Sequence, residues 1–403
     1  MSAFEGAEVS CLHAFGSGLR EVIAWVMLVR TGERSNPMKK VLAAVATSAG
    51  RTELAEFDVP EIPPEAGLLK LEAAGVCGSD WPSYLQTQQP RILGHENVGV
   101  IAKIGKIAAE RWGVQEGDRV ALEEYLPCGH CDICRTGDFR LCDSTDPWMG
   151  GIRYGSTPVS VLPSLWGGYS EYQFLHPNSV LHRVASHLPG TEAALALPLA
   201  NGIEWVCREG EAGIGTTVFI QGPGQQGLGC VIAAREAGAG CIIVSGLSVD
   251  KNRLELARKL GAHHTIDAER QNLSERIAEI TASRMADLVI DTSSGGPSTI
   301  VSALASAKKR GTVILAGKKH HPVPELHTDS FITRYLTVKG VRGHSYRSVE
   351  LALQLIASEK YPLSQMCTHQ YSLAEVDQAL RTVGGMSGTP SVHVTVLPWA
   401  SRT

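Results

Sequence analysis

Two short stretches of the chain combine the side-chain types that a catalytic zinc ion requires. Cys77 lies in the stretch Gly75–Asp80, and His95 is followed directly by Glu96. A thiolate, an imidazole and a carboxylate are all ligands that zinc accepts. Cys77 and His95 are too far apart for one helix but close enough for one folded unit. An isolated cysteine and histidine are also common as a core thiol and a solvated ring, so the assignment depends on the rest of the chain.

Four further cysteines are crowded into one short segment. They are separated by two, two and seven residues: Cys128, Cys131, Cys134 and Cys142. Four thiolates complete a tetrahedral zinc shell, and these short spacings let one loop supply all of them. A closed shell of four sulfur atoms leaves no position for a substrate, so we expect a structural zinc site. An iron–sulfur cluster and loop disulfides are the alternatives, but no proline follows Cys142 as it does in bacterial ferredoxins.

A glycine-rich turn indicates dinucleotide binding. The residues from Gly222 to Gly227 read Gly-Pro-Gly-Gln-Gln-Gly, between an expected strand at Thr217–Ile220 and an expected helix from Leu228. In this context the first glycine allows a tight turn, the second lets the backbone approach a pyrophosphate, and the third packs the helix on the strand. The candidate cofactor contacts in the turn are Gly222, Gly224, Gln226 and Gly227.

The residues after the next strand, Cys241–Val244, leave the nucleotide open. An acidic residue at the end of this strand binds the ribose 2′-hydroxyl of NAD. Asp250 stands slightly later and reaches the ribose if the loop is long, whereas Lys251 or Arg253 is suited to the 2′-phosphate of NADP. In the remaining alternative, all three are solvated charges at the start of a helix. We expect NAD(P), with NAD slightly favoured.

Length and composition bound the class of protein. A chain of 403 residues is long enough for two domains, and 43% hydrophobic with 19% charged residues is typical of a soluble globular protein. A net charge of −4 gives no basis for a nucleic-acid partner, and no apolar run is long enough to cross a membrane. Ten cysteines in a chain of this length are not a disulfide scaffold. A reducing, cytoplasmic location is the simpler interpretation.

The first 37 residues are expected to lie outside the folded domains. Their apolar run, Val22–Val29, is flanked by Arg20 and Arg30 and lacks a small-residue cleavage site, which makes a poor signal peptide. The residues from Met38 onward read as the opening strand of a domain. We therefore expect residues 1–37 to be a poorly ordered extension, or to precede the true start.

The pattern of strands and helices changes near Glu192. From Met38 to about residue 190, short strands broken by glycine and proline predict an all-β, barrel-like domain, with strands at Leu68–Ala74 and Asn97–Ile104. After Glu192, strands alternate with helices, which predicts a parallel, doubly wound sheet of the Rossmann type. A final helix pair and a strand at Val392–Val396 follow. The predicted class is α/β, with a catalytic domain of residues 38–193 and 344–403 and a cofactor domain of residues 194–343.

Taken together, these motifs resemble the zinc-dependent medium-chain alcohol dehydrogenases of the sorbitol and threonine dehydrogenase type. The resemblance covers the chain from Met38 onward. It is carried by Gly75–Asp80, Gly94-His95-Glu96-x-x-Gly99, Gly117–Val120, the four cysteines, Gly167–Tyr172 and the glycine-rich turn, in the family's order. It implies a GroES-like β-barrel catalytic domain, a Rossmann NAD(P)-binding domain and a homo-dimer or homo-tetramer.

The resemblance also implies the roles of the site residues. Cys77 and His95 bind the catalytic zinc, with Glu96 as a close or alternating ligand. Ser79 stands where the family keeps the hydroxyl that relays the alcohol proton, although a serine in a turn also commonly caps a backbone amide. Asp80 matches a carboxylate that orients His95. Asn201 is expected near the nicotinamide, where it contacts the cofactor or the substrate.

The chain departs from the family pattern at two positions. Leu197 stands where the family usually supplies a third zinc ligand, and leucine cannot bind zinc. Either Glu96 completes the shell, which we favour, or Glu204 reaches in, or zinc binds weakly. In addition, Trp81-Pro82 replaces the stretch where many members carry a relay histidine, so proton exit requires water or another group.

The function expected from the sequence is an NAD(P)-dependent alcohol dehydrogenase that interconverts an alcohol and its carbonyl. The absence of a third ligand at Leu197 keeps open a zinc-free enone or quinone reductase on the same scaffold. A dinucleotide-binding protein without turnover is the alternative from outside the enzymes. The presence of Cys77, His95 and Glu96 together disfavours the reductase, because a zinc-free site does not require that trio.

Overall fold

The computed structural model describes residues 40–323, 326–388 and 390–400. The extension expected at residues 1–37 and the expected start at Met38 lie outside this part of the chain. The first described strand is β1 (Lys40–Ser48). None of the helices in these ranges combines the length and the apolar character that crossing a membrane requires.

The catalytic part of the chain forms two sheets of short strands. The smaller sheet has the order β2-β1-β4, with β2 at Arg51–Asp58 and β4 at Arg91–Ile92. In the larger sheet every pair is antiparallel except β15 with β16. Its order is β15 (Cys367–Tyr371), β16 (His393–Val396), β3 (Gly67–Gly75), β5 (Glu96–Ile104), β6 (Arg119–Leu122) and β8 (Leu181–Arg183), with β7 (Tyr172–Leu175) also pairing with β3.

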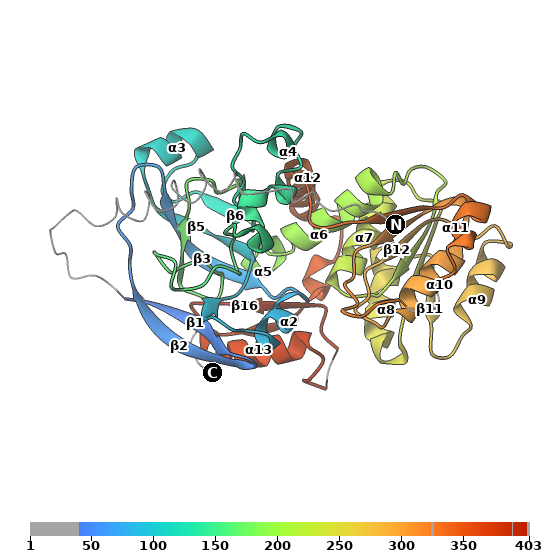
Figure 1. Cartoon of the computed structure of the whole chain (residues 1–403). Helices are drawn as coiled ribbons and strands as arrows, with labels where there is room; N and C mark the ends of the chain where they lie inside the picture. Colours follow the sequence, from blue (N-terminus) through green and yellow to red (C-terminus); the bar gives the residue numbers. More distant parts are fainter. Residues whose placement is uncertain (1–39, 324–325, 389, 401–403) are drawn as a thin grey trace, which may run out of the picture. The chain divides into compact units, whose positions relative to one another are not determined.

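The last strand of the chain lies against one of the first. Thr395 of β16 stands opposite Gly75 of β3, and Val396 stands opposite Ala74. Figure 1 shows this as a red C-terminal arrow beside the blue β3. Residues far apart in sequence therefore share one sheet, as a discontinuous catalytic domain requires. The domain boundaries at residues 193 and 344 stay predictions.

The segment between the two parts of the catalytic domain forms a six-stranded sheet in which every neighbouring pair is parallel. The order is β11 (His264–Asp267), β10 (Cys241–Gly246), β9 (Thr217–Gln221), β12 (Ala286–Asp291), β13 (Ala307–Leu315) and β14 (Thr337–Gly340). The chain runs outward from β9 in both directions, so the expected doubly wound Rossmann arrangement is confirmed.

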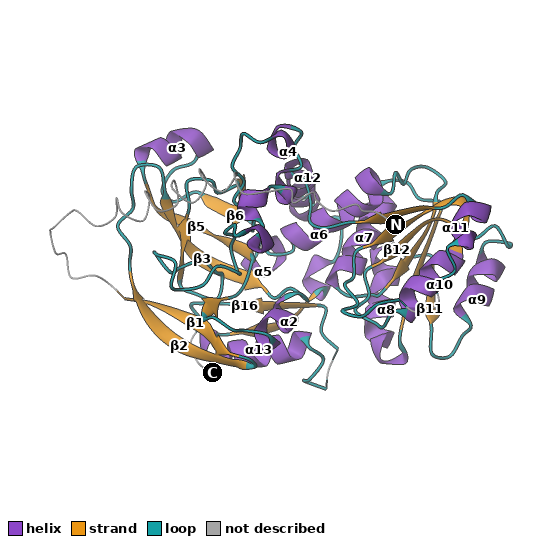
Figure 2. Cartoon of the chain, viewed as in Figure 1, coloured by secondary structure: helices purple, strands orange, loops and turns teal. Residues whose placement is uncertain are grey.

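Helices cover both faces of the parallel sheet because its strands are apolar on both faces. Val218 and Ile220 of β9 pack in a core with α7 (Gln225–Glu236) and α8 (Lys251–Leu260). Phe219, between them, packs in a second core with α9 (Leu273–Ile280) and α10 (Ser298–Ser306). Figure 2 shows these helices on both sides of the orange strands.

The remaining helices join or flank the two sheet systems. They are α2 (Asp80–Leu85), α3 (Lys106–Trp112), α4 (Asp132–Arg135), α5 (Gly190–Ala193), α6 (Ala196–Ile203), α11 (Asp329–Arg334), α12 (Tyr346–Ala357) and α13 (Val376–Val383). Residues of α6 and α12 belong to the same apolar core as α7, and this core also includes Ala73 and Val98 of the catalytic sheet.

One boundary matters for the site. The helix expected from Leu228 begins at Gln225, directly after its N-cap residue Gly224. The second half of the glycine-rich turn is therefore already helical. Because the first turn of a helix leaves its backbone N–H groups without partners, this is the end that binds anions.

Candidate metal centre and cofactor turn

The structure brings Cys77, His95 and Glu96 together. One ligand atom from each lies within 4.8 Å of the other two. Cys77 follows the end of β3, and Glu96 opens β5, which runs antiparallel to β3 with Gly75 opposite Glu96. The pairing of these strands therefore closes the gap in sequence between the two motifs.

Asp80 holds both the cysteine loop and the histidine ring. Its buried carboxylate accepts hydrogen bonds from the Cys77 N–H at 3.0 Å and from the Tyr169 hydroxyl at 2.8 Å. The other oxygen lies 3.3 Å from His95 Nδ1. A histidine anchored through Nδ1 presents Nε2 to a ligand, which is how a carboxylate orients a metal-binding imidazole.

Glu96 is buried with one oxygen bonded and one not. Its Oε1 accepts a hydrogen bond of 2.9 Å from Gln225 Nε2. Its Oε2 is buried and has no hydrogen-bond partner among the described residues. A buried carboxylate oxygen without a donor is costly, and a cation removes that cost. The donor set and this oxygen together fit a zinc ion.

The electrostatics of the cluster lead to the same conclusion. Burial raises the pKa of Glu96 to about 8. Burial and the nearby Glu96 charge raise the pKa of the Cys77 thiol. Burial opposes protonation of His95, but the carboxylates of Asp80 and Glu124 outweigh it and raise the pKa of that ring. A divalent cation among these groups would stabilise the thiolate and the carboxylate and displace the imidazole proton.

Neither Leu197, at the position of the family's third ligand, nor Glu204 belongs to the cluster of Cys77, His95 and Glu96. Leu197 lies in α6 and is 4% exposed in the apolar core, so it supplies packing. Glu204 is turned elsewhere: its Oε2 accepts hydrogen bonds from the hydroxyls of Ser345 at 2.6 Å and Ser348 at 2.7 Å. Its Oε1 lies 3.3 Å from Arg140. The alternative in which Glu204 reaches the metal is therefore wrong.

The four-cysteine lobe forms a second cluster. Its four sulfur atoms lie within 4.8 Å of one another, and every cysteine in the described part of the chain is a free thiol. The Cys131 and Cys134 amides donate to sulfur atoms of the preceding cysteines at 3.3 and 3.4 Å. Burial opposes ionisation of Cys142, but hydrogen bonds from the Cys128 N–H and from Ser144 lower its pKa to about 6. Loop disulfides are excluded here, and the arrangement fits a metal bound by thiolates.

The glycine-rich turn has the geometry that its sequence predicts. Gly222 has a φ of +95°, where a side chain would be strained. A Cβ atom at Gly224 would meet nothing within 4 Å, so the backbone is open to a ligand there. At Gly227 a Cβ atom would collide with the Gly222 carbonyl. Asn201 Nδ2 donates to Gln226 Oε1 at 3.1 Å, which brings this predicted residue to the turn.

The loop after β10 is lined with carboxylates. Asp250 accepts hydrogen bonds from the Leu247 N–H at 3.0 Å and from Arg253 at 2.7 Å. Arg253 also donates to the Ser391 carbonyl, so its charge is engaged within the protein. The Ser248 N–H and hydroxyl donate to Glu269 and Asp267 at 2.7 and 2.8 Å.

Ser79 keeps its hydroxyl available. It is exposed and precedes α2, but its side chain makes no cap hydrogen bond to that helix. The alternative in which Ser79 serves as a helix cap is therefore not what the structure has. Its backbone carbonyl instead accepts a hydrogen bond of 2.9 Å from Ser83.

Sequence reasoning missed two residues at the centre of the site, Gln225 and His393. Gln225 bonds to Glu96 and also, through Oε1, to His393 Nδ1 at 2.8 Å. His393 is fully buried, and burial lowers its pKa to about 4. The signal for Gln225 was its place in the glycine-rich turn. For His393 it was a histidine at the start of the short terminal strand β16.

Sequence reasoning also missed a buried network of hydrogen bonds between glutamates and histidines. Glu123 bonds to His182 at 3.1 Å and to His344 at 2.8 Å. His182 continues to Glu350 at 2.6 Å, and His344 bonds to Asn201 at 2.9 Å. This network connects the catalytic sheet to α6 and α12, so it has a structural role next to Asn201.

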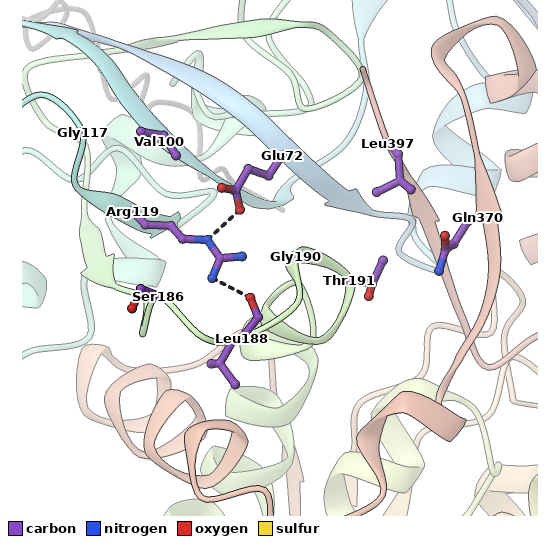
Figure 3. A pocket seen from close by; sticks show the side chains of 10 residues that line it. All are labelled: Glu72, Val100, Gly117, Arg119, Ser186, Leu188, Gly190, Thr191, Gln370 and Leu397. Carbon is purple, nitrogen blue, oxygen red and sulfur yellow. Dashed lines mark hydrogen bonds and ion pairs between the residues drawn. The ribbon is translucent and has the colours of Figure 1, made fainter. Parts of the chain in front are cut away.

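An open hollow of about 660 Å³ lies elsewhere in the catalytic part. Figure 3 shows Arg119 at its centre, directed toward Glu72 and Leu188. The guanidinium donates to Glu72 at 2.6 Å and to the carbonyls of Ala185 and Leu188 at 2.9 and 2.7 Å. Because the protein itself uses these donors, and no predicted site residue lines the hollow, we assign it no ligand.

Comparison with known proteins identifies relatives of this chain. A probable alcohol dehydrogenase of Mycobacterium tuberculosis is 35% identical over 89% of this chain and 98% of its own length. The chain belongs to the zinc-dependent medium-chain alcohol dehydrogenase family. The family models for an alcohol dehydrogenase GroES-like domain and a zinc-binding dehydrogenase match residues 63–186 and 227–358.

Two further relatives of this dehydrogenase agree. Sorbitol dehydrogenase of Bacillus subtilis is 31% identical over 84% of the chain and 92% of its own length. The crystal structure of an alcohol dehydrogenase from Thermotoga maritima superimposes with a TM-score of 0.77 at 26% identity, covering 89% of this chain and all of that one. The protein is accordingly an oxidoreductase that acts on alcohol groups with a nicotinamide cofactor, as the sequence predicted.

Proposed function

We propose that this dehydrogenase holds its catalytic zinc with Cys77, His95 and Glu96. The observation that carries the proposal is the convergence of these three ligand atoms within 4.8 Å. The buried Oε2 of Glu96, which lacks a donor, supports it further. Leu197 supplies no ligand, so Glu96 completes the set of three protein ligands and leaves a fourth position for the substrate.

The side chains around this centre divide the work of alcohol oxidation. A zinc ion bound there acts as a Lewis acid toward the alcohol oxygen. Asp80 fixes the His95 ring, and the Gly222–Gly227 turn holds the cofactor pyrophosphate at the start of α7. Ser79 accepts the alcohol proton on its free hydroxyl and passes it to water, because the chain has Trp81-Pro82 where a relay histidine is common. A nicotinamide bound at this turn would accept the hydride.

The four-cysteine lobe is proposed to hold a second, structural zinc. Its four sulfur atoms fill a tetrahedral shell, and its backbone amides donate to them. This site takes no part in the reaction. It fixes the lobe that contains α4 and gives a total of two zinc ions per chain.

NAD is proposed as the preferred cofactor. A 2′-phosphate requires cations or free amides at the loop after β10. Arg253 is instead paired with Asp250, and the Ser248 N–H is bonded to Glu269. Asp267 adds a further carboxylate. Charge repulsion from these carboxylates disfavours NADP.

The proposed substrate is a small secondary alcohol, with polyols as the first compounds to test. The name of the B. subtilis relative supports this class. A homo-dimer or homo-tetramer remains our expectation for the assembly.

The test is a panel of simple alcohols and polyols with NAD⁺ and NADP⁺, read at the absorbance of the reduced nicotinamide, together with zinc content by plasma emission. We expect about two zinc ions per chain and activity with at least one alcohol, with higher kcat/KM for NAD⁺. Cys77→Ser is expected to lose one zinc and the activity, whereas Cys207→Ser, a free thiol outside both clusters, keeps both zinc ions. One zinc in the unmodified protein, with reduction of enones instead, would contradict the proposal.

A further inference from the structure

Gln225 occupies an unusual position between the cofactor turn and the candidate metal centre. It is the first residue of α7, directly after Gly224, and is only 7% exposed. The side chain of Gln225 is buried against the catalytic sheet, where it contacts Glu96 of β5 and His393 of β16. Both ends of its amide are used there.

The partners fix the orientation of the amide. Glu96 is an acceptor when ionised, so the Gln225 nitrogen must face it, and Nε2 lies 2.9 Å from Glu96 Oε1. The Gln225 oxygen consequently faces His393, whose Nδ1 lies 2.8 Å away and must carry the proton that is donated. Gln225 is thus clamped from both sides, and it holds one specified oxygen of Glu96.

The two hydrogen bonds of the Gln225 amide also fix the position of the second oxygen of Glu96, Oε2. Oε2 lies above Gly75, where a Cβ atom would come within 2.5 Å of it, and it has no hydrogen-bond partner among the described residues. With Oε1 occupied by the Gln225 amide, Oε2 is the oxygen presented to a metal. Gln225 therefore restricts Glu96 to binding through a single oxygen.

From this geometry we infer that Gln225 is a positioning residue, which sets Glu96 as a zinc ligand and links that ligand to the cofactor turn. The inference rests on the proposed zinc site and deepens it. Any shift at the start of α7 on cofactor binding moves the donor of the Glu96 hydrogen bond. Metal binding and cofactor binding are then coupled through one amide, and the coupling acts in both directions.

A matched pair of variants tests this inference. Gln225→Leu keeps the size of the side chain and removes both hydrogen bonds. Gln221→Leu is the control: Gln221 is also buried, and its amide also makes two hydrogen bonds, to the Thr299 carbonyl and the Ser302 hydroxyl, but neither reaches the metal centre. Both variants lose a buried polar network of similar size.

The first measurement is release of zinc to a chromogenic chelator from the full chain. Cys77→Ser and Cys128→Ser assign the two release phases to the two clusters. We expect Gln225→Leu to lower the zinc affinity of the Cys77 site by roughly 10- to 100-fold, the range for loss of a group that orients a metal ligand. The four-cysteine site serves as an internal reference and stays unchanged. Gln221→Leu changes neither phase.

The second measurement is the affinity for NADH, by fluorescence titration, with and without zinc in the Cys77 site. We expect zinc to change this affinity by at least about 5-fold in the unmodified protein, the lower end of usual coupling. In Gln225→Leu the ratio of the NADH affinities with and without zinc is expected to fall to near one. A purely structural role for Gln225 would leave this ratio intact.

The outcomes separate the two proposals. If the unmodified protein shows no zinc phase that depends on Cys77, the proposed catalytic site itself fails. If that phase exists but Gln225→Leu leaves it within twofold, the role of Gln225 is overturned while the site stands. Equal loss from both clusters in Gln225→Leu would also overturn it, because the side chain would then only support the fold.

Discussion

Replacement of Gly75 by alanine is expected to break the metal centre by a small displacement. An added Cβ atom would lie 2.5 Å from Glu96 Oε2, 2.8 Å from His393 Cε1 and 2.9 Å from Glu96 Cβ. Ordinary contacts begin at 3.4 Å, so Oε2 must move by about 0.9 Å. Metal–ligand distances tolerate only about 0.2 Å. Because β3 and β5 are paired at this residue, the backbone cannot absorb the shift.

The expected cost has two parts. Overpacking in the core costs about 1–3 kcal/mol of unfolding free energy, measured by urea denaturation. In addition, Gly75→Ala is expected to retain one zinc per chain instead of two and to lose alcohol oxidation. Gly78→Ala is the matched control, because a Cβ atom there meets nothing within 4 Å, and we expect it to keep both zinc ions and normal stability. Full zinc content in Gly75→Ala would refute the placement of Glu96 over Gly75.

Asp80→Asn removes the charge that holds His95 and is expected to weaken the catalytic zinc by roughly 10- to 100-fold in chelator competition; an unchanged affinity would contradict that role. Cys128→Ser is expected to lose only the lobe zinc and to lower the thermal midpoint, so a variant with both zinc ions would contradict the lobe assignment. For Glu123, burial raises the pKa, but the contacts with His344 and His182 outweigh it and lower the pKa to about 2. Its contribution to stability is therefore present above the unfolded value of 4.5 and is lost as pH falls toward 2. Glu123→Gln is expected to be less stable at pH 6 and to show a flatter loss of stability between pH 5 and pH 3 in urea titrations; an unchanged slope would count against the prediction.

The sequence predicted the residues whose chemistry is local. Four closely spaced cysteines indicate a cluster because one loop can bring them together, and the structure has them within 4.8 Å. The glycine-rich turn is likewise recognisable because its neighbours in sequence are its neighbours in space. The strands and helices of the parallel sheet follow from the same kind of local apolar pattern.

The contacts that complete the site are not local. Gln225 and Glu96 are 129 residues apart, and His393 lies 168 residues from Gln225. Their meeting depends on the register of β16 beside β3, which no pattern in one strand specifies. For Glu204 the sequence allowed a metal ligand that the structure does not have, because its carboxylate accepts hydrogen bonds from Ser345 and Ser348 instead. Tertiary placement decides both cases.

Anomalous diffraction at the zinc edge from crystals of the full chain would show directly whether Cys77, His95 and Glu96 hold a zinc ion. We expect two peaks. One is enclosed by the four-cysteine lobe, and the other lies about 2.3 Å from Cys77 Sγ and about 2.0–2.2 Å from His95 Nε2 and Glu96 Oε2. A single peak in the lobe, from protein purified with zinc present, would contradict it. A second peak more than about 3 Å from both Glu96 oxygens would also contradict it, because that distance is typical of a hydrogen bond and too long for a zinc–oxygen bond.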